Sequence, residues 1–178
     1  DRVSRGLGDV YKRQFIYIMK KVFFSISFYF IVFVIVGQLP NINLKDVNGN
    51  TVNLSKFSND GKPIIVNFWA TWCKPCKLEL NTIADEYDDW VEVTGVKLIA
   101  VSIDDSRSSS RVEPYINAHE WEYLVLLDPN GDLKRAMNVN NVPHTFLLNG
   151  AGKIIWNHNN YSPGDENELY EELVKLTE

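Results

Sequence analysis

The segment NFWATWCKPC, residues 67–76, contains both cysteines of the chain, three positions apart. The residues before the cysteines, 62–69, form a continuous apolar run of strand length, which is typical of a central strand covered on both faces. Beyond the cysteines the apolar residues change to near-helical spacing, with Leu78, Ile83 and Tyr87 recurring. A buried strand that continues directly into a helix requires a sheet covered by helices, and it puts the two thiols at the junction.

Further strand and helix patterns follow that junction, and a hairpin signal precedes it. In LPNINLKDVNGNTVNLSKF, apolar residues flank Asn48-Gly49, a dipeptide typical of a tight hairpin turn. We expect further strands at 96–103, 123–127, 145–148 and 153–156, and helices around 113–116, 133–137 and 166–176. This order predicts an α/β fold, with a mixed central β-sheet, helices on both of its faces and an added N-terminal β-hairpin.

Composition limits the number of domains and the kinds of partner. A chain of 178 residues with 45% hydrophobic residues can bury one full core but is short for two. The formal net charge of -5 gives no basic surface for nucleic acid, so we expect no nucleic-acid partner. The first 21 residues contain six basic and two acidic side chains, so the remaining chain carries -9. An acidic domain therefore follows a basic leader.

The leader has the order of a secretory signal. Residues 19–37, MKKVFFSISFYFIVFVIVG, begin with Lys20 and Lys21 and continue as an uncharged apolar stretch. The stretch is short for a spanning helix, which needs about 20 apolar residues, so we expect a cleaved signal peptide, with a retained membrane anchor as the alternative. Residues 1–18 precede the internal Met19 and resemble translated adaptor sequence in their first part, so we expect them to be non-native. The folded domain is then residues 38–178.

The spacing of Cys73 and Cys76 predicts thiol-disulfide exchange. A helix N-terminus carries partial positive charge, which stabilises a thiolate and lowers the pKa of the thiol, so Cys73 is the expected nucleophile. Cys76, one turn further on, would attack the resulting mixed disulfide and release the reduced partner. Pro75 stiffens the turn between them, and Lys74 adds a positive charge that favours the thiolate.

Three other interpretations of the cysteine pair are open at this point. A purely structural disulfide would stabilise little because its loop is so short. Zinc usually takes four ligands, and His119, His144 and His158 show no ligand spacing, so we expect no metal. Two incidental buried cysteines would be the plainest case. A CxxC motif beside a strand-helix-strand pattern favours the redox interpretation.

The wider pattern of motifs resembles a known family. In chain order these are LPNINLKDVNGNTVNLSKF, GKPIIVNFWATWCKPC, VSIDD and NVPHTFLLNGAGKI. From about residue 39 to the C-terminus, the chain is similar to the TlpA/ResA-like extracytoplasmic thiol-disulfide oxidoreductases of the thioredoxin superfamily. The resemblance implies a thioredoxin fold and an enzyme without a cofactor, with Cys73 as the exposed nucleophile and Cys76 as the resolving thiol.

The resemblance also implies roles for residues around the thiols. Pro143 matches the proline that is cis in this superfamily and faces the disulfide, where it offers the backbone of Val142 to an extended partner chain. The expected substrate-binding residues are Trp72, Lys74, Pro75, Val142 and Pro143.

Glu79 matches a glutamate that the family uses near the disulfide. Its carboxylate could take up the Cys76 proton, and burial would raise its pKa toward a useful range. The alternative is a plain first-turn acid, favoured by the helix dipole. Asn67 stands where cytoplasmic thioredoxins have a buried aspartate, which leaves more of the proton transfer to Glu79.

Two positions depart from the family pattern. His144 replaces the threonine that is common after the cis-proline. It could add charge near Cys73 below about pH 6.5, but we favour a surface substitution without consequence. The pair Leu80-Asn81 lacks the proline that is often found just after the glutamate, so the entry into the helix could differ.

The sequence thus predicts an extracytoplasmic, periplasmic oxidoreductase that reduces disulfides of partner proteins, for example in cytochrome c maturation. A membrane thiol reductant would regenerate the dithiol, and a monomer is expected. The alternatives are a peroxiredoxin-like peroxidase, a disulfide-introducing oxidant of the same fold, and a binding module whose CxxC motif is vestigial. The reduction potential cannot be predicted from the sequence, since thioredoxin-like proteins with the same fold have potentials from about -270 to -120 mV.

Overall fold

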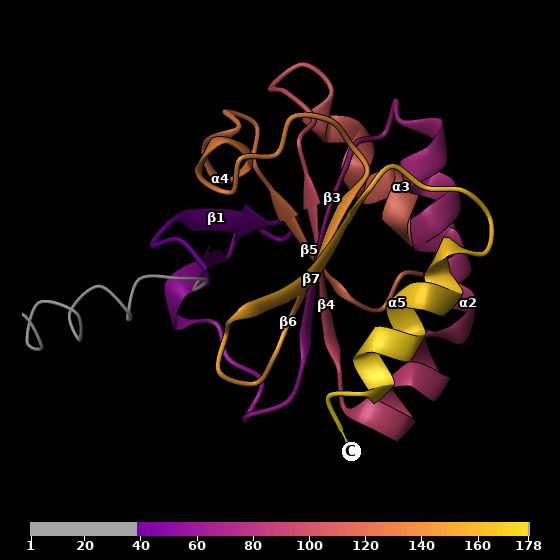
Figure 1. Ribbon diagram of the computed structural model, residues 1–178. Coiled ribbons are helices and arrows are strands. Elements are labelled where there is room, and N and C mark those ends of the chain that lie inside the picture. The colour runs from indigo at the N-terminus through magenta and orange to yellow at the C-terminus, as the bar shows by residue number, and fades with distance from the viewer. Residues whose placement is uncertain (1–38, 178) are drawn as a thin grey trace, which may run out of the picture. The chain divides into compact units, whose positions relative to one another are not determined.

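The computed structural model describes residues 39–177. The expected non-native leader, 1–18, and the expected signal or anchor, 19–37, lie outside the described residues. Seven strands form one mixed sheet in the order β2-β1-β5-β4-β3-β6-β7 (Figure 1). The strands are β1 Asn43–Asp46, β2 Thr51–Asn53, β3 Ile64–Trp69, β4 Lys97–Ser102, β5 Leu124–Leu127, β6 His144–Leu148 and β7 Ile154–Asn159. The helices are α2 Lys74–Thr94, α3 Val112–Ala118, α4 Asp132–Ala136 and α5 Asp165–Val174, with 3-10 turns η1 Leu54–Lys56 and η2 Ser109–Arg111.

The sheet is parallel at its centre and antiparallel toward its edges. Strands β3, β4 and β5 are parallel, whereas β6 pairs antiparallel with β3 and β7 antiparallel with β6. On the other side, β1 pairs antiparallel with β5 and with β2. Parallel strands end at the same edge of a sheet, so the segments that follow β3 and β4 emerge side by side. One of those segments carries the cysteines.

Two apolar layers cover the sheet, because neighbouring residues of each central strand face opposite sides. All six residues of β3 are buried, as its continuous apolar run predicts. Ile65 and Trp69 belong to the core under α2, α3 and α5, and Val66 and Phe68 to the core on the α4 side. Figure 1 shows α2, α3 and α5 on one side of the sheet and α4 on the other. The expectation of a mixed sheet with helices on both faces is confirmed.

At the N-terminal end of the described chain, β1 and β2 pair as a hairpin around Asn48-Gly49. Gly49 has a φ of 87°, and the Asp46 carboxylate accepts hydrogen bonds from the backbone N–H groups of Asn48 and Asn50. At the other end of the sheet, β7 extends beyond the expected 153–156 because its pairing with β6 continues to Asn159. Among residues 39–177, no helix combines the length and the apolar character that crossing a membrane requires.

Candidate active site

The two cysteines lie where β3 gives way to α2, and they are joined by a disulfide. Cys73 is the N-cap residue of α2, with extended backbone, and its sulfur accepts a hydrogen bond from the N–H of Cys76 at 3.3 Å. Pro75 occupies the first turn, where a missing N–H costs no helical hydrogen bond. Cys73 is 5% exposed and Cys76 is fully buried. The sulfur of Cys73 is thus the one nearer to solvent, and it sits against the positive end of the helix.

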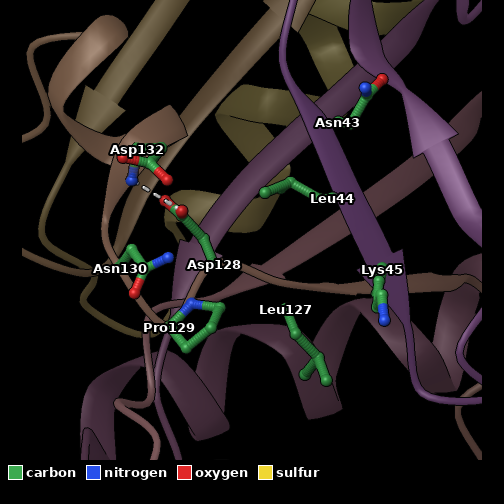
Figure 2. Close-up of a pocket in the computed structure, with 8 residues that line it drawn as sticks. All are labelled: Asn43, Leu44, Lys45, Leu127, Asp128, Pro129, Asn130 and Asp132. Atoms are coloured by element: carbon green, nitrogen blue, oxygen red, sulfur yellow. Dashed lines mark hydrogen bonds between the residues drawn. The ribbon is translucent and has the colours of Figure 1, made fainter.

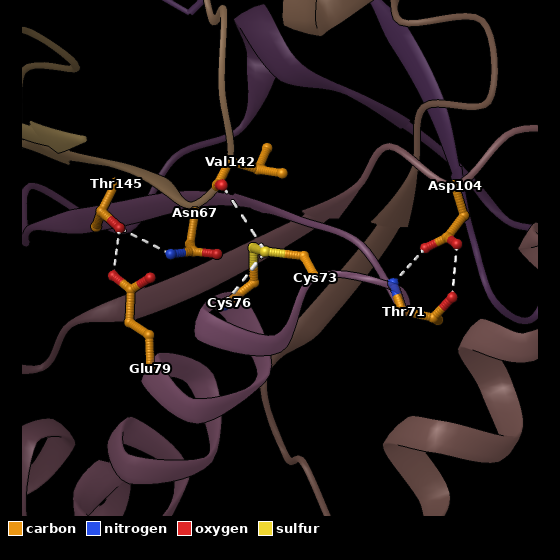
Figure 3. Close-up of a disulfide and its surroundings, with 8 residues drawn as sticks. All are labelled: Asn67, Thr71, Cys73, Cys76, Glu79, Asp104, Val142 and Thr145. Carbon is orange, nitrogen blue, oxygen red and sulfur yellow. Dashed lines mark hydrogen bonds between the residues drawn. A yellow bond between two sulfur atoms is a disulfide. The ribbon is translucent and has the colours of Figure 1, made fainter. Parts of the chain in front are cut away.

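The Val142–Pro143 peptide bond is cis, as expected, and it lies next to the disulfide. The carbonyl oxygen of Val142 is 3.8 Å from the sulfur of Cys73 (Figure 3). The two residues are 69 positions apart, and the antiparallel pairing of β6 with β3 brings them together. An extended chain passing Val142 would therefore run directly past the Cys73 sulfur.

A buried polar chain lies beneath the disulfide. The Asn67 amide donates to the Thr145 hydroxyl at 2.7 Å, and that hydroxyl donates to the Glu79 carboxylate at 2.6 Å. All three side chains are buried, and Glu79 is 4% exposed. Figure 3 shows the remaining amide oxygen of Asn67 on the side of the cysteine pair. Among the described residues, neither that oxygen nor Oε2 of Glu79 has a hydrogen-bond partner.

Burial changes the acidity of Glu79. Desolvation raises its pKa from 4.5 to about 7, while the hydrogen bond from Thr145 opposes part of the shift. The expected increase is therefore present. A carboxyl group with a pKa near neutrality can both accept and return a proton at neutral pH. Cys76 and Glu79 lie three residues apart in α2, on its buried face toward the sheet.

A second carboxyl group, Asp104, holds the loop that leads into Cys73. It follows β4 and is 1% exposed. Its oxygens accept hydrogen bonds from the backbone N–H of Thr71 at 2.8 Å and from the Thr71 hydroxyl at 2.6 Å (Figure 3). The Ser102 hydroxyl donates a third hydrogen bond to Asp104, at 2.9 Å. Asp104 thereby ties the end of β4 to the segment two residues before the cysteine.

The surface beside Cys73 is apolar and basic. Trp72 is 62% exposed and Leu78 is 47% exposed. Lys74 is exposed, and the ammonium group of Lys77 lies 5.4 Å from the centre of the Tyr115 ring. Neither lysine is within ion-pair distance of a carboxylate in the described part of the chain.

His144 differs from the expectation of a surface substitution. Both ring nitrogens are buried without a hydrogen-bond partner among the described residues, and the ring stacks on Phe146 with 4.3 Å between centroids. Burial lowers the pKa of His144, since the charged ring would lose hydration. The side chain shares the Phe146 face of β6, whereas Thr145 faces Glu79. His144 is therefore a partly buried ring whose surroundings favour the neutral form.

Sequence reasoning missed three residues of this site: Thr71, Asp104 and Thr145. Asp104 lay within the quoted VSIDD motif, directly after a buried strand, which is a position that often serves a site in α/β folds. Thr145 is a polar residue directly before the apolar run 146–148, and its polarity at a strand position was its only signal.

A separate shallow pocket of about 240 Å³ lies between β1 and the turn after β5 (Figure 2). Its most buried polar group, Asp128, accepts hydrogen bonds from the backbone N–H groups of Asp132 and Lys134. That carboxylate is thus occupied in capping α4. The pocket contains neither cysteine nor any other residue that the sequence assigned to a site.

Comparison with known proteins is consistent with this geometry. Residues 35–157 match the model of the AhpC/TSA family. The chain is 34% identical over 119 residues to the thiol-disulfide oxidoreductase ResA of Bacillus subtilis, an alignment that covers 67% of this chain and 64% of that one. The chain therefore spans just under two thirds of that relative.

Two solved structures are also similar. A thioredoxin-like protein from Porphyromonas gingivalis is 50% identical, with a TM-score of 0.69 over 79% of this chain and 94% of that one. StoA from Bacillus subtilis is 28% identical, with a TM-score of 0.59 over 78% of this chain and all of that one. The expected thioredoxin-like fold is thus confirmed.

Proposed function

The chain belongs to the AhpC/TSA family, and on that premise we propose that it is a thiol-disulfide oxidoreductase that reduces disulfides of partner proteins. One observation carries the proposal. Cys73 and Cys76 can close a disulfide at the start of α2, with the Cys73 sulfur between a helical N–H and the backbone of Val142. The names of the relatives, thiol-disulfide oxidoreductases, support it.

The reaction transfers two electrons to the partner. In the reduced protein the Cys73 thiolate attacks one sulfur of the partner disulfide, and the other partner sulfur leaves as a thiolate and takes up a proton. Cys76 then loses its proton and attacks the Cys73 sulfur. The second partner sulfur leaves as a thiolate and takes up a proton from solvent, and the Cys73–Cys76 disulfide of the structure is formed. The partner ends as a dithiol.

We assign the proton from Cys76 to Glu79. Cys76 is fully buried, so its proton needs a nearby acceptor. Glu79 is buried on the same face of α2 and has a pKa of about 7, which suits proton transfer at neutral pH. The hydrogen bond from Thr145 fixes the orientation of the accepting carboxylate.

The partner chain is proposed to bind across the loop that holds Pro143. Its backbone would pair with that of Val142, next to the Cys73 sulfur, while Trp72, Lys74 and Pro75 contact its side chains. These surface contacts would place the partner disulfide next to the Cys73 sulfur, so no deep pocket is required.

The cellular setting is also a proposal. Residues 19–37 would export the protein to the periplasm, with or without retention as an anchor, and residues 38–178 would form the working domain. A membrane thiol reductant would return electrons to the dithiol, and oxidised apocytochrome c is one substrate that fits. We propose that the domain acts as a monomer.

Reduction of a disulfide-containing protein by the reduced domain tests the proposal. Wild type should reduce the substrate with loss of one dithiol per disulfide, and Cys73→Ser should be inactive. Consumption of hydrogen peroxide at a comparable rate, without reduction of the protein disulfide, would instead identify a peroxidase. Full function in cells carrying Cys73→Ser would identify a binding module.

A further inference from the structure

The charges of α2 are arranged against the helix dipole. Its first turn contains Lys74 and Lys77 and no acidic residue, and its last turn contains no basic residue. Its exposed acids follow in the second half: Asp85, Glu86, Asp88, Asp89 and Glu92. Acids near the N-terminus and bases near the C-terminus stabilise a helix, so this arrangement costs local stability. The two lysines therefore point to a role outside the helix.

The lysines border an exposed apolar surface at the nucleophile. Trp72 immediately precedes Cys73, and Leu78 lies one helical turn beyond Lys74 on the same side of α2. We call Trp72, Lys74, Lys77 and Leu78 the basic rim. The ammonium group of Lys77 lies 5.4 Å from the centre of the Tyr115 ring, a cation–π contact that favours one position for its charge. The rim is positive on a chain whose remainder after the leader is strongly acidic.

We propose that the basic rim docks a polypeptide segment that carries carboxylate side chains close to its disulfide. This inference rests on the proposed function and specifies its substrate class. Acidic side chains would meet Lys74 and Lys77, while an apolar neighbour would cover Trp72 and Leu78. The competing explanation gives the lysines a single effect, stabilisation of the Cys73 thiolate, and it predicts no preference for the charge of the partner.

The test uses two disulfide peptides that differ only in flanking residues, aspartates in one and lysines in the other. Rate constants for their reduction by the reduced domain are measured in low and high salt. The ratio of the two rate constants is compared because substitution of Lys74 or Lys77 would also change the reactivity of Cys73. That change affects both peptides equally and cancels in the ratio. Wild type should favour the acidic peptide at least fivefold in low salt, and 0.5 M salt should bring the ratio close to one.

Charge-reversing substitutions show whether the preference for the acidic peptide depends on the lysines of the basic rim or on any surface lysine. The double variant Lys74→Glu, Lys77→Glu should reverse the preference. Lys97→Glu should leave it unchanged, since Lys97 is exposed at the start of β4, at the opposite end of that strand from Asp104. Equal rates for both peptides in wild type, or a ratio that the double variant does not change, would overturn the inference and leave the proposed function standing. Reduction of neither peptide would contradict the proposed function itself.

A different observation concerns Asp104, a buried carboxyl group that takes no part in the proposed chemistry. Its hydrogen bonds reach the backbone and the hydroxyl of Thr71, and the Ser102 hydroxyl anchors it to β4. The next turn of the chain is closed by the N–H of Cys73, which donates to the carbonyl of Ala70 at 3.0 Å. The position of the Cys73 sulfur relative to the N–H of Cys76 thus depends on a loop that Asp104 holds.

We infer that Asp104 is a positioning residue for Cys73. Asp104→Asn keeps the size and two hydrogen-bonding atoms but carries no charge, whereas Asp104→Ala removes the whole network. The measured quantities are the pH dependence of Cys73 alkylation in the reduced domain and the equilibrium of the dithiol with glutathione. The rate of Cys73 alkylation at pH 7 should stay within twofold of wild type in the Asn variant. It should fall at least fivefold in the Ala variant, in which the pKa of the Cys73 thiol should rise.

A purely structural role predicts a different result. Both variants would then lose stability, while their Cys73 alkylation profiles and glutathione equilibria would be the same as those of wild type, and this would overturn the inference. Should the Ala variant fail to fold, Thr71→Val removes one hydrogen bond and leaves the charge of the site unchanged. It should slow alkylation in the same direction, and the matched Thr71→Ser, which keeps the hydroxyl, should not. Equal rates for Val and Ser would also overturn the inference.

Discussion

Thr145 on β6 donates a 2.6 Å hydrogen bond to Glu79 on α2, across 66 residues of sequence. The same hydroxyl accepts from Asn67 on β3, so one oxygen joins the sheet to the face of the helix that carries Cys76. A buried carboxyl group with one hydrogen-bond donor among residues 39–177 and a pKa near 7 is suited to exchange protons with Cys76, the proposed resolving thiol. We expect this contact to govern the pKa of Glu79, and through it the pH dependence of stability and of partner release.

The stability of the oxidised domain should fall as pH rises from about 4.5 to 7. The folded state holds the Glu79 proton up to about pH 7, whereas the unfolded chain releases it near 4.5. The unfolded state therefore binds fewer protons in this window, and the loss amounts to at most about 3 kcal/mol. Denaturant unfolding across this range measures it. Glu79→Gln should remove this part of the slope, while Glu92→Gln, an exposed control on the same helix, should keep it.

Release of the partner should depend on the same carboxyl group. Attack by Cys76 on the mixed disulfide should slow below about pH 7 in wild type, as Glu79 becomes protonated. Glu79→Gln should slow this step by about 100-fold or more at pH 7, as expected for loss of a general base. Rapid-mixing kinetics that resolve formation and breakdown of the mixed disulfide would show this. A Gln variant with an unchanged breakdown rate would contradict the assignment.

Thr145→Val should raise the pKa of Glu79 above its wild-type value. The hydroxyl stabilises the ionised carboxylate, and valine removes it without changing the size of the side chain much. The free energy of unfolding should fall by about 1 to 3 kcal/mol because buried polar atoms lose a partner. Carbon-13 NMR titration of Glu79 measures the pKa. Thr145→Ser keeps the hydroxyl and should behave as wild type.

Substitution of each cysteine should block the reaction at a different step. Cys76→Ser should still react with a partner disulfide but stop at the mixed disulfide, which would accumulate as a covalent complex. Cys73→Ser should form no such complex, since Cys76 is fully buried. Non-reducing gels and intact-mass measurement distinguish the two. A stable complex through Cys76 alone would reverse the assigned roles.

The sequence predicted the fold well where patterns are local. The apolar run of β3, its passage into α2 and the Asn48-Gly49 turn follow from spacing within short windows. Cys73 and Cys76 are only three residues apart in sequence, so their pairing could be predicted without knowledge of the tertiary structure.

The rest of the site depends on contacts between distant segments. The bond between Thr145 and Glu79 requires the register of β6 against β3, and the bonds from Thr71 to Asp104 span 33 residues. His144 was misjudged because its burial depends on which face of β6 it occupies, and a one-residue shift in register exchanges the two faces.

The reduction potential of the Cys73/Cys76 pair decides whether this dithiol can reduce the disulfides of partner proteins. The domain without residues 1–37 would be equilibrated with thiol buffers of known potential, and the fraction oxidised read from tryptophan fluorescence or thiol labelling. A protein that reduces partner disulfides should have a value near or below about -230 mV. A value of about -120 mV would contradict the proposed reductase function and identify a protein that introduces disulfides instead.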